Sequence, residues 1–296
     1  MHGSRPALRR AASALAGRRP LPLHGATVLV TGGASGIGRL IALGAAHRGA
    51  GRVVVWDLDL QGVEAVAAEI RSQGADARAE RVDVTDAAAV EAAAAGAGEV
   101  DVAVNNAGVV TGAPLEDATE EGIRRTFEVN ALAPYWLTRA VLPGMRARDR
   151  GAVVTVASAA GLVGVARQTD YSATKHAAVG FAESLAAELR KDGSHVTSLA
   201  VCPFYIDTGM FAGVRSRVPW LLPVLDPHHV AQEVLDAVEA GRTRLLLPRA
   251  VGLIAPLRAL PTPVFDRAMD VLGVNATMDG FTGRRSRLFA GRETAR

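Results

Sequence analysis

Residues 26–38, Ala-Thr-Val-Leu-Val-Thr-Gly-Gly-Ala-Ser-Gly-Ile-Gly, carry a β-branched run straight into a glycine-rich turn. They predict a strand over Ala26–Thr31, a tight turn, and a helix that continues to about Arg48. Glycines at such a junction let backbone N–H groups approach a pyrophosphate at the helix N-terminus. The candidate contacts to this ligand are Gly32, Ser35, Gly36, Ile37 and Gly38. Taken alone, the turn is equally explained as ordinary punctuation between a strand and a helix.

The same alternation of short β-branched runs and Ala-rich helical runs continues as far as Leu247. Further strands are predicted at residues 52–56, 77–82, 100–104, 152–157, 196–201 and 243–247. Helices are predicted at residues 60–73, 86–95, 116–145 and 171–191, and after the cap Asp226, which Pro227 follows in the first helical position. Short strands separated by helices form βαβ units. We therefore predict an α/β fold with a single doubly wound parallel sheet and helices on both faces.

Composition fits one such domain with tails, since 49% of the 296 residues are hydrophobic. Cys202 is the only cysteine, which excludes an intrachain disulfide and fits a reducing compartment, so we expect a cytoplasmic protein. No run approaches the roughly 20 apolar residues of a spanning helix, and no secretory signal is apparent. The adjacent His228 and His229 point in different directions on a helix, and we expect no metal site.

The net charge of +3 hides a concentration of arginine at both ends. Residues 1–24 carry five Arg and no acid, and residues 242–296 carry ten Arg against four acids. These ends suit peripheral contact with an anionic membrane surface, or they are solubilising tails. The segment Leu245–Met269 mixes apolar residues with Arg, which suits a cover for the core, a dimer contact or a bilayer surface. We find no nucleic-acid-binding signature.

An acid follows the second predicted strand, about 20 residues beyond the glycine-rich turn. Asp57 ends Val53-Val54-Val55-Trp56-Asp57, where its carboxylate can hydrogen-bond the ribose hydroxyls of NAD and repel the extra phosphate of NADP. We therefore expect NAD, with NADP less suited. The alternative is that Asp57 merely caps a helix and Asp59 is the solvated partner.

Polar residues also follow the third and fourth strands. Asp83 and Val84 end the third strand and are expected to border the adenine, unless they form only a turn. Asn106, Ala107 and Gly108 belong to Asn-Asn-Ala-Gly after the fourth strand. This motif is a plain turn by itself, but ligands bind at the carboxyl edge of a doubly wound sheet.

Tyr171 and Lys175 stand four residues apart at the start of a predicted helix, so they share one helical face. A nearby ammonium favours the ionised phenol, so we expect Lys175 to lower the pKa of Tyr171. A phenol tuned in this way can exchange protons with an alcohol or carbonyl oxygen. The alternative is an exposed Tyr beside a solvated Lys.

Together these motifs resemble the short-chain dehydrogenase/reductase family from about Ala26 to Leu247. They are Thr-Gly-x-x-x-Gly-Ile-Gly at 31–38, Asn-Asn-Ala-Gly at 105–108, Ser158, and Tyr-x-x-x-Lys at 171–175. The resemblance implies a Rossmann-type NAD(P)-binding catalytic domain over residues 25–247, between basic extensions at 1–24 and 248–296.

The resemblance also implies the catalytic roles. Tyr171 exchanges the proton, Lys175 holds the ribose and lowers the pKa of Tyr171, and Ser158 binds the substrate oxygen. Asn130 holds a water that links Lys175 to solvent. Taken alone, Asn130 is a helix-breaking amide and Ser158 a strand-end hydroxyl.

The loop after the sixth predicted strand departs from the family in one position. Ile206 and Thr208 match residues that touch the nicotinamide carboxamide. Phe204 stands where the family usually has Gly, which leaves the path of this loop open.

The closer resemblance is to the retinol and hydroxysteroid dehydrogenase branch, whose members act on lipophilic alcohols. A lid is expected at Gly209–Leu225, with Phe211, Val214, Val218, Trp220, Leu221 and Leu222 as its apolar residues. Leu162, Val163 and Val165 are expected on the opposite wall. An apolar pocket of this kind suits a retinoid, steroid or long-chain alcohol, unless the residues pack on each other or on a partner subunit.

The sequence thus predicts an oxidoreductase that transfers a hydride between a lipophilic alcohol and NAD. The family commonly forms homodimers or homotetramers, here through the helices at 116–145 and 171–191. Alternatives are an NADPH-dependent carbonyl reductase, a non-catalytic cofactor-binding regulatory protein, and a sugar-nucleotide epimerase. The epimerase would require a larger C-terminal domain.

Overall fold

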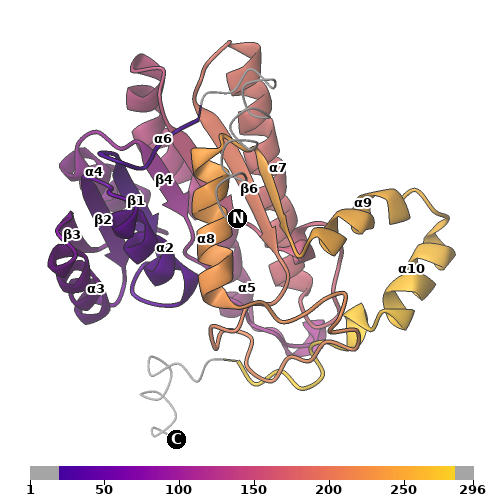
Figure 1. Ribbon diagram of the computed structural model, residues 1–296. Coiled ribbons are helices and arrows are strands. Elements are labelled where there is room, and N and C mark those ends of the chain that lie inside the picture. Colours follow the sequence, from indigo (N-terminus) through magenta and orange to yellow (C-terminus); the bar gives the residue numbers. More distant parts are fainter. Residues whose placement is uncertain (1–19, 284–296) are drawn as a thin grey trace, which may run out of the picture.

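The computed structural model describes residues 20–283 (Figure 1). Residues 1–19 and 284–296, which include most of the N-terminal extension and the Arg-rich end of the C-terminal one, lie outside the described residues. Seven strands form one parallel sheet in the order β3-β2-β1-β4-β5-β6-β7. Their bounds are β1 Thr27–Thr31, β2 Arg52–Asp57, β3 Asp76–Arg81, β4 Val102–Asn105, β5 Ala152–Val156, β6 Thr197–Pro203 and β7 Arg244–Leu247. The predicted fold class is confirmed.

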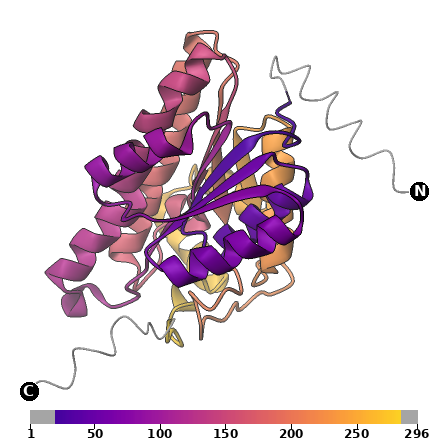
Figure 2. The same ribbon diagram turned by 90° about the vertical axis from the view of Figure 1, so that its left-hand side faces the viewer.

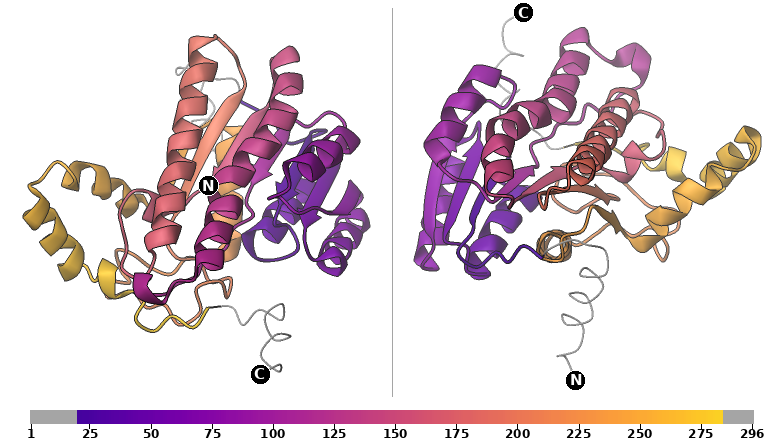
Figure 3. Two further views of the ribbon diagram at one scale, coloured as in Figure 1. Left: turned by 180° about the vertical axis from the view of Figure 1, so that it is seen from behind. Right: turned by 90° about the horizontal axis from the view of Figure 1, so that it is seen from above.

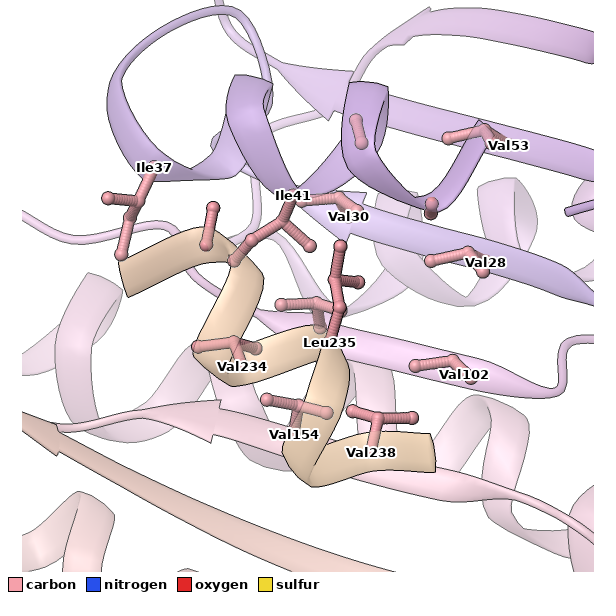
Figure 4. Close-up of a cluster of buried hydrophobic side chains, with 14 of the residues drawn as sticks. Val28, Val30, Ile37, Ile41, Val53, Val102, Val154, Val234, Leu235 and Val238 are labelled. Carbon is pink, nitrogen blue, oxygen red and sulfur yellow. The ribbon is translucent and has the colours of Figure 1, made fainter. Parts of the chain in front are cut away.

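Helices cover both faces of the sheet (Figure 2). The helices of one layer are α2 Gly36–His47, α3 Leu60–Ser72 and α8 Pro227–Glu239. Those of the other are α4 Ala87–Ala97, α6 Ala133–Ala147 and α7 Thr169–Lys191. Successive strand residues point to opposite faces, so Val28 and Val30 pack under α2 and α8 while Leu29 packs in the opposite core. In Figure 4, Ile41 of α2 and Leu235 of α8 meet over these valines. Burial on both sides explains why inner strands such as β1 and β5 are largely apolar, whereas the edge strand β3, Asp-Ala-Arg-Ala-Glu-Arg, is mostly polar.

Aspartate side chains cap the helices α3, α4 and α8. Asp59 accepts from the Gly62 N–H at the start of α3, and Asp86 accepts from two N–H groups of α4. Asp226 caps α8 by accepting from His229, and Pro227 occupies the first position, as predicted.

The single long helix predicted at 116–145 is divided in the structure. A short 3-10 turn (Leu115–Asp117) precedes α5 (Glu120–Phe127), which Thr119 caps. A π-helical turn, Glu128–Leu132, then joins α5 to α6. Turns of this type interrupt the regular hydrogen-bond ladder and are often found at functional sites.

The chain after β7 forms short helices that lie beside the carboxyl end of β6 and β7. They are η4 Arg249–Leu253, α9 Ile254–Leu257, α10 Thr262–Val271 and η5 Val274–Ala276. Figures 1 and 3 show α9 and α10 at the edge of the molecule opposite β3. Sequence periodicity did not reveal these helices. Over residues 20–283, no helix has the length and apolarity needed to span a bilayer.

Strand order reverses between β1 and β4, because the chain moves outward to β3 and then returns to the other side of β1. The glycine-rich turn after β1 and the Asn-Asn-Ala-Gly turn after β4 therefore meet at the carboxyl edge. Ligands bind at this point in doubly wound sheets.

Candidate active site

One cavity of about 1040 Å³ runs along the carboxyl edge of the sheet. Most of the predicted site residues line it: Gly32, Ser35, Gly36, Ile37, Asp57, Asp83, Val84, Asn106, Ala107, Gly108, Ser158, Tyr171, Lys175, Ile206 and Thr208. Two predicted residues, Gly38 and Asn130, are not part of its lining. Gly38 packs against Gly32 and Asn106, and Asn130 hydrogen-bonds Val109, so both lie just outside the lining.

The glycine-rich turn is packed so closely that side chains are excluded. Gly32 has a φ of +64°, and a Cβ there would lie 2.8 Å from the Ala107 Cα. A Cβ on Gly38 would lie 2.3 Å from both the Gly32 carbonyl oxygen and the Asn106 Nδ2. Gly38 is therefore required for the first turn of α2 to pack against the loop, not for direct contact with the cavity.

Asn106 fastens the turn after β4 to the turn after β1. Its Nδ2 donates to the carbonyl oxygens of Thr31 (2.9 Å) and Gly32 (3.0 Å). The Thr31 hydroxyl accepts from the Asn106 and Ala107 N–H groups and donates to the Val104 carbonyl. The Asn-Asn-Ala-Gly motif is thus more than a plain turn, because it holds the loops after β1 and β4 together where they line the cavity.

These features fit a dinucleotide. Gly36 opens α2 with a φ of +58°, and the first turn of α2 contains no acidic residue. An N-terminus of this kind accepts an anionic pyrophosphate, and the absence of side chains on the glycines lets it approach the backbone. The residues present therefore fit the pyrophosphate of a dinucleotide.

Asp57 and Asp59 have different roles. Asp57 ends β2 and accepts hydrogen bonds from the Ala34 N–H (3.1 Å) and the Asp59 N–H (3.2 Å). Asp59 caps α3 through the Gly62 N–H at 3.0 Å. The alternative in which Asp57 is the helix cap is wrong, because Asp59 holds that position. Both carboxylates line the cavity.

Arg81 also lines this part of the cavity, and sequence reasoning missed it. It ends β3 directly beside Asp57 in the parallel register, and its Nε donates to the Leu58 carbonyl at 3.2 Å. Pairing the ends of the second and third predicted strands would have placed a guanidinium next to the predicted ribose site.

Ser158, Tyr171 and Lys175 meet where β5 ends and α7 begins. The Ser158 hydroxyl accepts from the Ala160 N–H (3.1 Å) and hydrogen-bonds the Tyr171 hydroxyl. The Lys175 Nζ donates to the Val156 carbonyl (2.8 Å) and lies 5.5 Å from the centre of the Tyr171 ring. Tyr171 is 5% exposed and Lys175 4% exposed, so the alternative of an exposed Tyr beside a solvated Lys is wrong.

The expected direction of the Tyr171 pKa shift requires correction. Burial raises the pKa of the Tyr171 phenol well above its ordinary value, and the hydrogen bond from Ser158 only partly opposes this. Burial also lowers the pKa of Lys175 to about 8. Attraction between phenolate and ammonium favours the ionised phenol, but the loss of water around the buried phenolate has the larger effect.

Asn130 lies in the π-helical turn and is 2% exposed. Its Nδ2 donates to the Val109 carbonyl (2.9 Å) and the Thr174 hydroxyl (3.2 Å), and its Oδ1 accepts from the Val109 N–H (2.9 Å). A Cβ on Gly108 would lie 3.4 Å from this Oδ1 and 3.7 Å from the Lys175 Nζ. Asn130 thus joins the loop after β4 to α7, close to Lys175.

The remainder of the cavity is largely apolar. From the expected lid, Phe211, Leu221 and Leu222 line it, but Trp220 is 81% exposed and does not. On the opposite wall, Val163 and Val165 line the cavity. Leu162 instead packs beside a buried cluster that includes Ala178 and Cys202.

The C-terminal segment supplies apolar lining that the sequence did not reveal. Leu257, Met269, Leu272, Val274 and Phe281 are among these residues. Within residues 245–269, Val251, Leu257 and Met269 line the cavity, so part of this segment covers the site. The dimer contact and the bilayer surface stay predictions.

Phe204 does not divert the loop after β6. Its N–H donates to the Leu247 carbonyl at 2.7 Å, and its ring packs edge-on against Tyr205. Ile206 and Thr208 still line the cavity.

Comparison with known proteins agrees with this geometry. Residues 26–219 match the short chain dehydrogenase family model. Mouse epidermal retinol dehydrogenase 2 is 38% identical over 275 residues, covering 89% of this chain and 87% of the relative. Mouse 17-beta-hydroxysteroid dehydrogenase 13 is 36% identical over 241 residues, covering 80% of this chain and 78% of the relative.

Solved structures give the same result. A short chain dehydrogenase/reductase from Burkholderia phymatum, in complex with NAD, superposes with a TM-score of 0.73 at 27% identity, over 81% of this chain and 94% of that one. A metagenomic short-chain oxidoreductase, in complex with NADP, superposes with a TM-score of 0.64 at 31% identity, over 76% and 97%. The chain therefore belongs to the short chain dehydrogenase family and is an oxidoreductase. Within the family, its sequence groups with the retinol and hydroxysteroid dehydrogenase branch.

Proposed function

We propose that this protein oxidises a lipophilic alcohol, of retinoid, steroid or long-chain type, with NAD. One observation carries the proposal: a single cavity has the glycine cradle and Asp57 at one end, and Ser158, Tyr171 and an apolar wall at the other. When bound, a nicotinamide dinucleotide would accept the hydride and its oxidised ring would add positive charge near the phenol, while the protein positions the two reactants.

The proton chemistry belongs to Tyr171. As a phenolate it removes the alcohol proton, while the Ser158 hydroxyl donates to the substrate oxygen and stabilises its developing charge. Burial opposes the phenolate, so positive charge is needed nearby. With a pKa of about 8, Lys175 is mostly protonated at neutral pH and supplies part of that charge.

Asp57 supports NAD as the cofactor. Its carboxylate stands beside the turn that suits the pyrophosphate, where it can accept from the ribose hydroxyls and repel a phosphate. The second candidate, reduction of a carbonyl with NADPH, is favoured by Arg81. Its guanidinium lines the same region and could attract the extra phosphate.

Steady-state turnover tests the proposal, with NAD and NADP over a panel of retinol, steroids and long-chain alcohols. Tyr171→Phe removes only the hydroxyl, so turnover should fall by about 10²- to 10⁴-fold while NADH still binds in a fluorescence titration. Full activity of Tyr171→Phe would refute the mechanism. Binding of NADH without turnover of any alcohol or carbonyl would favour the non-catalytic alternative.

We also propose a homodimer or homotetramer that forms through α6 and α7. Phe127, Leu132 and Tyr135 are between 39% and 44% exposed at the start of this surface, and the Tyr135 ring packs at a tilt against Phe181 of α7, with ring centres 4.6 Å apart. Such residues suit an interface. Tyr135→Arg should reduce the mass measured by light scattering to that of the monomer, and an unchanged mass would exclude this face.

Peripheral membrane contact through the C-terminal segment is the last part of the proposal, with the chain otherwise cytoplasmic. Leu253, Val264 and Val271 are 53%, 51% and 64% exposed there, and Arg249 and Arg267 lie in the same segment. This combination suits an anionic interface. Val264→Gln with Val271→Gln should reduce co-sedimentation with phosphatidylserine vesicles. Equal pelleting of variant and wild type would reject membrane contact by these residues.

A further inference from the structure

Gln168 is a polar residue in an apolar part of the cavity wall. It lines the cavity, is 1% exposed, and immediately precedes α7, three residues before Tyr171. Its amide contacts Tyr205 and Met278, two members of a buried cluster that also includes Val165 and Val274. An amide in such a setting destabilises the fold unless its polar atoms are hydrogen-bonded.

A chain of hydrogen bonds fixes the orientation of this amide. The Thr277 hydroxyl donates to the Val274 carbonyl (2.8 Å), so it must accept from the Tyr205 hydroxyl (2.8 Å). Tyr205 has then used its only proton, and its contact with Gln168 at 3.4 Å requires a donor. Nε2 of Gln168 is that donor, and it also meets the Met278 sulfur at 3.0 Å.

The Gln168 carbonyl oxygen, on the other side of the amide, has no hydrogen-bond partner among residues 20–283. A buried acceptor without a partner costs about 1–3 kcal/mol, and such groups are rare in folded proteins. Here the unpaired oxygen belongs to a residue of the cavity wall, beside the residue proposed to exchange the proton. Its position points to a ligand group that completes it.

We propose that Gln168 Oε1 accepts a hydrogen bond from a second donor on the substrate, separate from the alcohol that reacts. The proposal rests on the proposed function, and it narrows the substrate class. Both residues line the same cavity, so one molecule bound there can present the reacting alcohol to Tyr171 and a second hydroxyl or amide N–H to Gln168. The substrate is a lipophilic hydroxy-alcohol or hydroxy-amide and not a simple alkanol.

Paired probes test this directly. Dodecane-1,3-, 1,4- and 1,5-diol are each compared with the methyl ether of the second hydroxyl, which keeps the oxygen but cannot donate. Wild type should prefer one diol over its ether in kcat/KM by about 5- to 150-fold. In Gln168→Met, which matches the side chain in size but has no carbonyl, the preference should fall below about twofold.

Two further variants separate binding from structure. Val163→Ala changes the same cavity wall without touching a polar group, and it should keep the preference for the diol. Tyr205→Phe removes the acceptor that orients the Gln168 amide, so the preference should decrease but not vanish.

Equal kcat/KM for every diol and its ether in wild type would overturn the proposal without any need for a variant. An undiminished preference in Gln168→Met would also overturn it, because Gln168 would then only anchor the C-terminal segment. In both cases the proposed function survives, since both probes are turned over. Turnover of neither probe, with NAD or with NADP, would overturn both.

Discussion

Replacing Asp57 by Ala tests the assignment of the ribose-binding carboxylate. The change removes an acceptor from the ribose hydroxyls and also from the Ala34 and Asp59 N–H groups, at 3.1 and 3.2 Å. A charge-assisted hydrogen bond contributes about 1.5–3 kcal/mol, so affinity for NADH should fall about 10- to 150-fold. NADPH loses no such bond and escapes a repulsion. The ratio of the two dissociation constants should therefore move toward NADPH by at least about tenfold.

Fluorescence titration with NADH and NADPH measures this ratio, and Asp59→Ala is the matched control. Asp59 also carries a carboxylate at the cavity, but it caps α3 through the Gly62 N–H. Its loss should lower stability by about 1 kcal/mol without changing the cofactor ratio. A shift in the ratio for Asp59→Ala and none for Asp57→Ala would refute the assignment and show that Asp59 is the ribose partner.

Three other outcomes follow from the packing and charge of the site. Lys175 has a native pKa of about 8, below the roughly 10.4 of the unfolded chain, so the unfolded state binds more protons between these values. The free energy of unfolding should therefore rise with pH between about pH 8 and 10.4. Thermal unfolding of Lys175→Met, measured over this range, should lack that part of the rise. Parallel stability–pH profiles of wild type and variant would contradict this. Gly38→Ala should destabilise by at least about 2 kcal/mol and abolish cofactor binding, because its Cβ would meet backbone at 2.3 Å. Gly180→Ala, with open space around the new Cβ in α7, should stabilise by about 0.5–1 kcal/mol in denaturant melts, and equal effects of the two changes would exclude a steric cause. Arg81→Gln should weaken the binding of NADPH but not of NADH. An unchanged affinity for NADPH in this variant would show that Arg81 does not favour NADP.

The sequence predicted the sheet and most of the cofactor end because these depend on local signals. A β-branched run, a glycine-rich turn and a capped helix are each encoded within a few residues, as around Gly32 and Asp59. The π-helical turn at Asn130 was not predictable, since it follows from how α5 and α6 pack and not from local propensity. Arg81 required knowledge of strand register.

The substrate wall was the least predictable part. Met269, Val274 and Phe281 lie about 100 residues after Tyr171 in the sequence, and nothing local indicates that they return to it. The predicted shift of the Tyr171 pKa was wrong in direction for a related reason. Desolvation depends on every segment that covers the phenol, including Phe211, which packs edge-on at 5.7 Å.

The division of the cavity between two stretches of chain has an evolutionary consequence. Ser158, Tyr171 and Lys175 all precede β6. On the apolar wall, Val163 and Val165 precede it too, but Phe211, Leu257 and Phe281 follow it. Mutations in the later stretch can therefore alter which alcohols are accepted while the proton-transfer groups stay in place. Exchange of this stretch between related chains is a direct route to new selectivity without rebuilding the chemistry.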